Sequence, residues 1–129
     1  MPKRILSTSR NATVLRTRNL VLQSAGYDVT TTRDPKEFTN FIEKESFDAV
    51  VMGDSIDLAE RVELASKIAA SKPSLPLVIF FKTQAEAQQL LPYAHTLIGS
   101  LDGPERLIAA VEGAVQQNKH NKPGRRPHA

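Results

Sequence analysis

Short apolar runs rich in β-branched residues alternate along this chain with longer segments of helical periodicity, and this alternation restricts the possible folds. Strands are expected near 4–8, 28–32, 49–52, 76–81 and 96–98. In the helical segments, apolar residues recur at spacings of three and four. Strands that alternate with helices form a parallel sheet covered on both faces. The sequence therefore predicts one α/β domain with a five-stranded parallel sheet.

Acceptor side chains mark the expected beginnings of several helices. Asp34 is followed by Pro35 and by Glu37, which predicts a capped helix closed by a capping box. The segment 57–60, DLAE, repeats the capping-box pattern, and 83–86, TQAE, predicts a third start. These signals place the helix beginnings close to the carboxyl ends of the expected strands.

The positive charge of the chain is concentrated at its C-terminus. The formal net charge is +3, from 17 basic and 14 acidic residues. Residues 117–129 contain four bases and no acid, so thirteen bases and fourteen acids leave residues 1–116 at −1. We expect a folded domain over 1–116 and a basic, disordered tail over 117–129. Such a tail could contact nucleic acid, although a purely solubilising tail is the simpler interpretation.

Several classes of protein are disfavoured by what the sequence contains. The chain has no cysteine, which excludes disulfides, thiolate catalysis and cysteine-ligated metals. The longest apolar run, Leu77–Phe81, is far shorter than the roughly 20 residues of a membrane span. The N-terminal residues show no signal-peptide pattern, so we expect a cytoplasmic protein. His95, His120 and His128 are isolated, no glycine-rich phosphate loop follows the first strand, and no constellation of residues indicates an enzyme.

Five stretches of the chain resemble the receiver domain of two-component response regulators. They are KRILSTSRN, SAGYDVTTTRD, FDAVVMGDS, SLPLVIFF and SLDGPERLIAAV, and the resemblance covers about residues 3–116. It implies a flavodoxin-like (βα)5 three-layer sandwich whose strands follow the order 2-1-3-4-5. It also implies a role in signal transduction through a phosphorelay.

The reactive residues of that family are replaced in this chain. In the family, an acidic pair after the first strand binds magnesium, and an aspartate ending the third strand accepts a phosphoryl group. A hydroxyl residue and a lysine, at the ends of the fourth and fifth strands, then hold the phosphoryl oxygens. These five positions are taken here by Ser9, Arg10, Gly53, Phe81 and Ser100. The resemblance therefore implies a degenerate pocket without bound magnesium, in which the ring of Phe81 occupies the place of the hydroxyl.

Asp54 lies one residue beyond the position of the phosphoryl acceptor. Because side chains alternate faces along a strand, we expect Asp54 to point away from the pocket. Together with Ser55 and Asp57, it is better suited to favour the N-terminus of the next helix. We hypothesise that Arg10 pairs with Asp54, whereas Arg18 is interpreted as part of a solvated helix face.

These observations favour a receiver-like signalling module that has lost its phosphorylation site and acts through protein–protein interaction. A homodimer could form through residues 84–116, where Leu90, Leu97 and Arg106 combine apolar and charged character. Two alternatives remain open. One is a phosphorelay receiver that is still phosphorylated at Asp54, and the other is a nucleic-acid-associated protein that uses the basic tail.

Overall fold

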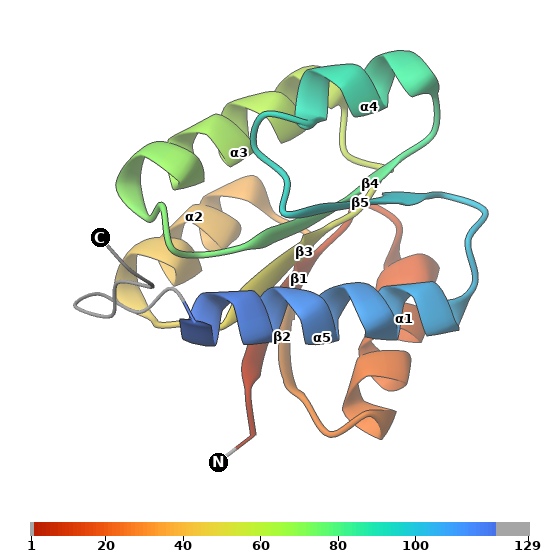
Figure 1. The fold of residues 1–129 in the computed structure, drawn as a ribbon. Coiled ribbons are helices and arrows are strands. Elements are labelled where there is room, and N and C mark those ends of the chain that lie inside the picture. The colour runs from red at the N-terminus through yellow and green to blue at the C-terminus, as the bar shows by residue number, and fades with distance from the viewer. Residues whose placement is uncertain (1, 121–129) are drawn as a thin grey trace.

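The computed structural model describes residues 2–120, which form five strands and five helices in strict alternation (Figure 1). The strands are β1 (Arg4–Thr8), β2 (Asp28–Thr32), β3 (Ala49–Met52), β4 (Leu77–Phe81) and β5 (Thr96–Gly99). The helices are α1 (Ala12–Ser24), α2 (Pro35–Lys44), α3 (Leu58–Ser71), α4 (Gln84–Leu90) and α5 (Pro104–His120).

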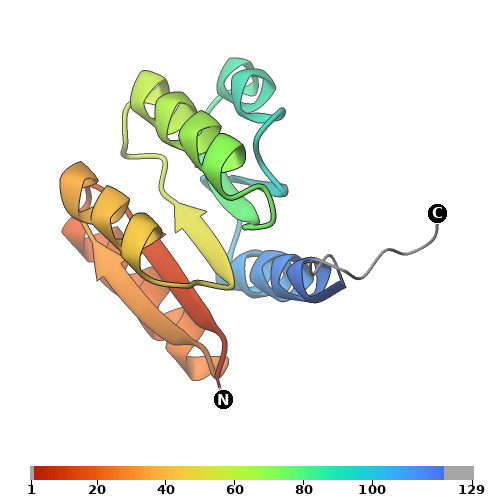
Figure 2. The same ribbon diagram turned by 90° about the vertical axis from the view of Figure 1, so that its left-hand side faces the viewer.

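All five strands are parallel and belong to one sheet with the order β2-β1-β3-β4-β5. Helices α1 and α5 cover one face of this sheet, and α2, α3 and α4 cover the other (Figures 1 and 2). This arrangement confirms the predicted flavodoxin-like α/β sandwich. The carboxyl ends of all the strands meet at one edge, where ligands of such sheets usually bind.

Each face of the sheet has its own apolar core. Strand β3 contributes to both, because Val50 lies in the core under α2 and α3 while Val51 lies in the core under α5. The whole of β3 is buried, as expected for the central strand of a parallel sheet. The two cores therefore support the sheet from both faces.

The predicted cap of α2 is confirmed, but its capping box is wrong. The Asp34 carboxylate accepts a hydrogen bond from the backbone N–H of Lys36 at 3.0 Å. Glu37 does not reach back to the backbone of Asp34. Instead, the Thr32 hydroxyl accepts from the Asp34 N–H at 3.1 Å and donates to the Glu37 carboxylate. Thr32, the last residue of β2, therefore accepts the hydrogen bond from the Asp34 N–H that Glu37 would accept in a capping box.

The capping box predicted over 57–60 is also wrong. Asp57 stands at the N-cap of α3 but makes no side-chain capping bond, and Glu60 is paired with Arg10. At α4, by contrast, the hydroxyl of Thr83 accepts from the backbone N–H of Glu86 at 3.2 Å, as expected. At the beginning of α3, the acid expected to cap the helix, Glu60, therefore binds Arg10 instead.

The last helix, α5, extends to His120 and so includes the first four residues of the tail predicted over 117–129. The remainder of that predicted tail, 121–129, lies outside the described residues. Within residues 2–120, no helix combines the length and apolar character that crossing a membrane requires.

Candidate functional site

The register of the sheet brings the ends of β1, β3 and β4 together at its carboxyl edge. Thr8 is paired with Met52, and the backbone N–H of Gly53 donates to the carbonyl of Thr8 at 2.8 Å. Met52 is in turn paired with Ile79, one residue before Phe80. Ser9, Gly53 and Phe80 therefore lie at the same level of the sheet.

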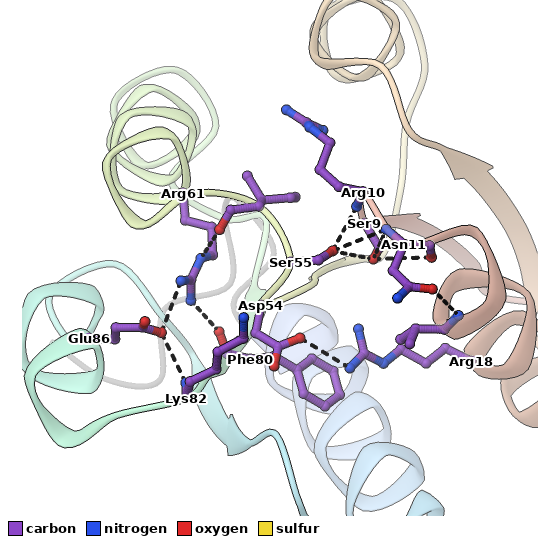
Figure 3. Close-up of polar contacts among 12 residues, drawn as sticks. Ser9, Arg10, Asn11, Arg18, Asp54, Ser55, Arg61, Phe80, Lys82 and Glu86 are labelled. Atoms are coloured by element: carbon purple, nitrogen blue, oxygen red, sulfur yellow. Dashed lines mark hydrogen bonds and ion pairs between the residues drawn. The ribbon is translucent and has the colours of Figure 1, made fainter.

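The loops after β1 and β3 are tied together by neutral hydrogen bonds (Figure 3). The hydroxyl oxygens of Ser9 and Ser55 are 2.8 Å apart. The Ser55 hydroxyl also accepts from the backbone N–H groups of Arg10, at 2.8 Å, and Asn11, at 3.2 Å. Ser9 is 1% exposed. Where the resemblance places an acidic pair, this chain therefore has a network of hydroxyl groups around the buried Ser9.

Arg10 does not pair with Asp54, so that hypothesis is wrong. Its guanidinium forms an ion pair with Glu60 at the beginning of α3, and Nη1 donates to the carbonyl of Arg33 at 3.0 Å. In Figure 3 the side chain of Arg10 extends away from Asp54. Glu60 is available to Arg10 because it takes no part in capping α3.

Arg18 is the cation that lies beside Asp54 (Figure 3). Its Nη2 is 3.6 Å from Asp54 Oδ1, and the two side chains are only 12% and 13% exposed. The Cζ of Arg18 lies 3.6 Å from the centroid of the Phe80 ring, in a cation–π contact. The interpretation of Arg18 as a solvated residue is therefore wrong: an aromatic face and a carboxylate draw it to the sheet edge.

Burial dominates the electrostatics of Arg18. Removal from water lowers the pKa of its guanidinium from the ordinary value, while the charge and hydrogen bonding of Asp54 oppose that shift. The guanidinium stays protonated through such a shift, because the ordinary pKa of arginine lies far above neutral pH. Nη1 is buried and has no hydrogen-bond partner. The site therefore contains a fixed, desolvated positive charge that a single carboxylate partly balances.

The absence of a side chain at Gly53 leaves just enough space for the guanidinium of Arg18 and the side chain of Ser9. A Cβ atom added there would lie 2.9 Å from Arg18 Nη1 and 3.0 Å from the Cβ of Ser9, closer than ordinary van der Waals contact. The space beside the end of β3 is therefore filled by Arg18 and Ser9. At the position that the resemblance assigns to the phosphoryl acceptor, the missing side chain makes room for a guanidinium from α1.

Two other predicted pocket residues lie elsewhere. Phe81 packs against the core on the α3 and α4 side, so the ring that faces Arg18 is that of Phe80. The Ser100 backbone N–H donates to the Phe81 carbonyl at 2.9 Å. Ser100 also lies at the rim of a cavity of about 270 Å³ between α1 and the beginning of α5. Ser9 and Gly53 are therefore adjacent, whereas Phe81 turns toward the other core.

Arg61 is a buried arginine that no motif in the sequence points to. It is 1% exposed. Its Nε donates to the carbonyl of Ile56 and its Nη1 to that of Phe80, both at 2.7 Å. Its Nη2 lies 2.9 Å from Glu86 Oε1 in an ion pair (Figure 3). The available signal was its place in α3, three residues from Leu58 and four from Ala65 on the inward stripe.

The carboxylate of Glu86 connects Arg61 to the loop before α4. It accepts from the backbone N–H of Lys82 at 2.9 Å as well as from Arg61. Burial alone would raise the pKa of Glu86, but these hydrogen bonds and the nearby positive charges outweigh it and lower the pKa. Arg61 and Glu86 thereby fix the end of β4 relative to α3 and α4.

The residues present at this edge do not fit the magnesium ion that receiver domains of the resembled family bind. Magnesium prefers several carboxylate or water oxygens in octahedral geometry. Ser9 offers a hydroxyl already bonded to Ser55, Arg10 offers a positive charge, and Asp54 is engaged by Arg18. Over 2–120, no group of three or more His, Asp or Glu side chains is arranged to hold a metal ion.

Comparison with known proteins identifies the fold. No family model matches the sequence, and no curated protein matches it. Among solved structures, a CheY-like receiver domain protein of Methanospirillum hungatei superposes with a TM-score of 0.85 at 19% identity. This match covers 95% of the present chain and 100% of the other.

Two further structures agree. The signal receiver domain of an HD domain-containing protein of Pseudomonas fluorescens gives a TM-score of 0.84 at 13% identity, covering 94% of this chain and 100% of that one. The chemotaxis response regulator CheY4 of Vibrio cholerae gives 0.78 at 17% identity, covering 88% and 99%. The chain thus has the fold of CheY-like receiver domains.

Proposed function

We propose that this protein is a receiver-like signalling module that is not phosphorylated and acts by binding another protein. The observation that carries the proposal is the guanidinium of Arg18, 2.9 Å from the place where a side chain at Gly53 would begin. Gly53 and the guanidinium of Arg18 lie where receiver domains of the family that this chain resembles have a carboxylate.

The charge balance of the site supports this proposal. Phosphoryl transfer to a carboxylate depends on metal ions and positioned cations that neutralise the transferring group. Ser9 and Ser55 provide hydroxyls where a metal would need carboxylates. Asp54, the only acid directly after β3, is 3.6 Å from a guanidinium that is itself stacked on Phe80. To react, Asp54 would have to leave this ion pair and attack without a metal.

Arg18 and the buried Arg61 also support a fixed conformation of the sheet edge. Arg18 links α1 to the loop after β3, and Arg61 links α3 to the end of β4 and to α4. Each is held by partners on a different element from its own. A module with these links would present one constant surface to its partner, in place of a surface that changes on phosphorylation.

Phosphorylation by a small-molecule donor tests the proposal. The protein is incubated with acetyl phosphate and magnesium, and its intact mass is measured beside that of a receiver domain known to react. We expect the known receiver to gain one phosphoryl group and this protein to keep its mass. A gain that the variant Asp54→Asn abolishes would overturn the proposal and favour a phosphorelay receiver.

A further inference from the structure

A cavity of about 270 Å³ lies between α1 and the beginning of α5. Much of its wall is apolar and comes from α1, β4 and α5: Val14, Val21, Phe80, Pro104 and Leu107. A mainly apolar cavity with a few well-placed polar groups is the usual form of a small-molecule site. The volume is at the lower end for such sites and suits a ligand of about ten non-hydrogen atoms.

Arg18 brings a positive charge to the wall of this cavity. A guanidinium carries several N–H donors in a fixed fork. Nη1 of Arg18 lies against Gly53, and Asp54 engages only Nη2, at 3.6 Å. Arg61, by contrast, makes hydrogen bonds of 2.7, 2.7 and 2.9 Å. The Nε–H and the second N–H of Nη2 on Arg18 therefore remain for a ligand, and a carboxylate is the group that matches them best.

Asp102 brings the opposite charge to the same cavity. Its Oδ2 accepts from the backbone N–H of Gly99 at 3.0 Å, and its own backbone N–H donates to the Gly99 carbonyl at 3.0 Å. These two bonds fix the carboxylate on a closed turn, and Oδ1 takes no part in them. Within residues 2–120, no basic side chain forms an ion pair with Asp102. An ammonium group in the cavity would therefore meet an ordered carboxylate that no base neutralises.

We propose that this cavity binds an α-amino acid with a large apolar side chain. The carboxylate of the ligand pairs with Arg18, its ammonium group pairs with Asp102, and its side chain packs against Phe80 and Leu107. Asp102 repels an anion and Arg18 repels a cation, so a small zwitterion is the class of ligand that suits both charges. Because both groups border one small cavity, the adjacent charges of an α-amino acid can reach them together. This inference does not depend on the loss of phosphorylation.

The face predicted for a homodimer, residues 84–116, offers less to a ligand or partner than expected. Leu90 is fully buried under α4, and Leu97 is half-buried against the core, so neither offers free apolar surface. Arg106 is exposed in the first turn of α5. The apolar surface that the sequence placed on this face is therefore taken up by the core.

Titration of the ¹⁵N-labelled full chain with L-leucine tests the proposal. We expect saturable shifts of the backbone signals of residues 13–18 and 99–103, which border the cavity. The dissociation constant should be about 0.1–1 mM, as the few contacts of so small a ligand allow. The signals of Lys36 and Lys67, in the groove between α2 and α3, should not move.

Two analogues of leucine each remove one charge and keep the apolar body. The analogue 4-methylpentanoate lacks the ammonium group, and 3-methylbutylamine lacks the carboxylate. Each should bind about tenfold more weakly than leucine, because one charged hydrogen bond is lost and one charge of the cavity stays unpaired.

Variants of the chain assign each charge of the ligand to its partner. Asp102→Asn should weaken leucine binding about tenfold and bring it level with that of 4-methylpentanoate. An asparagine oxygen can still accept from the Gly99 N–H, so the turn is kept. Asp57→Asn removes the same charge from an exposed acid that makes no capping bond, and it should change no affinity. Arg18→Gln should bring leucine level with 3-methylbutylamine. If Arg18→Gln does not fold, Asp102→Asn and the two analogues still decide the outcome.

Three results would overturn the inference. One is the absence of saturable shifts at about 20 mM leucine, far above the expected dissociation constant. Another is a set of shifts that leaves residues 13–18 and 99–103 unmoved. The third is equal binding of leucine and 4-methylpentanoate by the parent chain, which would show that Asp102 does not recognise the ammonium group. None of these results bears on the acetyl phosphate experiment, so the two proposals fail separately.

Discussion

Arg18 brings together three interactions that are individually modest. Its guanidinium rests on the Phe80 ring, approaches Asp54 and borders Gly53. Arginine suits this position because its planar group stacks on aromatic faces and is less strongly hydrated than an ammonium group. The periodicity of α1 alone indicates that Arg18 is solvated. Its partners, Phe80 and Asp54, come from other elements at the sheet edge. Its burial could therefore not be predicted from the sequence of α1 alone.

The contacts at Gly53 predict a cost for any side chain there. Gly53→Ala should lower the free energy of unfolding by about 1–3 kcal/mol, because its methyl group would press on Ser9 and Arg18. Gly113→Ala is the matched control, since nothing lies within 4 Å of an added Cβ at that position of α5. It should stabilise the helix by up to about 1 kcal/mol. Urea unfolding of both variants measures the difference, and equal effects would contradict the close packing described at Gly53.

At the scale of the elements, the strands and helices could be predicted from the sequence because their apolar periods are clear. The first three strands have the predicted bounds. The capping boxes of α2 and α3 could not be predicted, because Thr32 and Arg10 bind the acids that would have closed them. Local patterns identify the acceptors at a helix start, whereas tertiary neighbours decide what those acceptors bind.

The buried ion pair of Arg61 and Glu86, which links α3 to α4, should contribute more to stability than the exposed pair of Glu63 and Lys67. Arg61→Ala should lower the free energy of unfolding by about 3–5 kcal/mol, because two carbonyls and Glu86 lose their partner. Glu63→Gln, which breaks the exposed pair with Lys67, should cost less than about 0.5 kcal/mol. Urea unfolding compares the two. A small effect of Arg61→Ala would show that this arginine does not hold the three elements together.

The lowered pKa of Glu86 gives the same link a pH dependence. A carboxylate with a lowered folded-state pKa stabilises the fold above its ordinary pKa of about 4.3, and this stabilisation is lost as pH falls through the folded-state value. Glu86→Gln should therefore be less stable than the parent at neutral pH. The difference should hold down to about pH 5 and shrink below about pH 4.3. A difference that is independent of pH between 7 and 3 would contradict the ionised pair with Arg61.

For the whole molecule, the sheet order 2-1-3-4-5 was predicted from the resemblance and is confirmed. The candidate site could be located but not described from the sequence. The substituted positions Ser9 and Gly53 are adjacent, as expected. The cation beside them comes from α1, and not from Arg10, because side chains from separate elements converge only once the chain is folded.

The central claim is that Arg18 and Ser9 fill the space in which a phosphoryl group and its metal would otherwise bind. Beryllofluoride, a stable phosphoryl analogue, tests this claim directly when it is added with magnesium to ¹⁵N-labelled protein. We expect the backbone signals of Gly53 and Asp54 and the Nε–H signal of Arg18 to remain unshifted at millimolar ligand. Saturable shifts at these three positions that require both magnesium and beryllofluoride would contradict the claim.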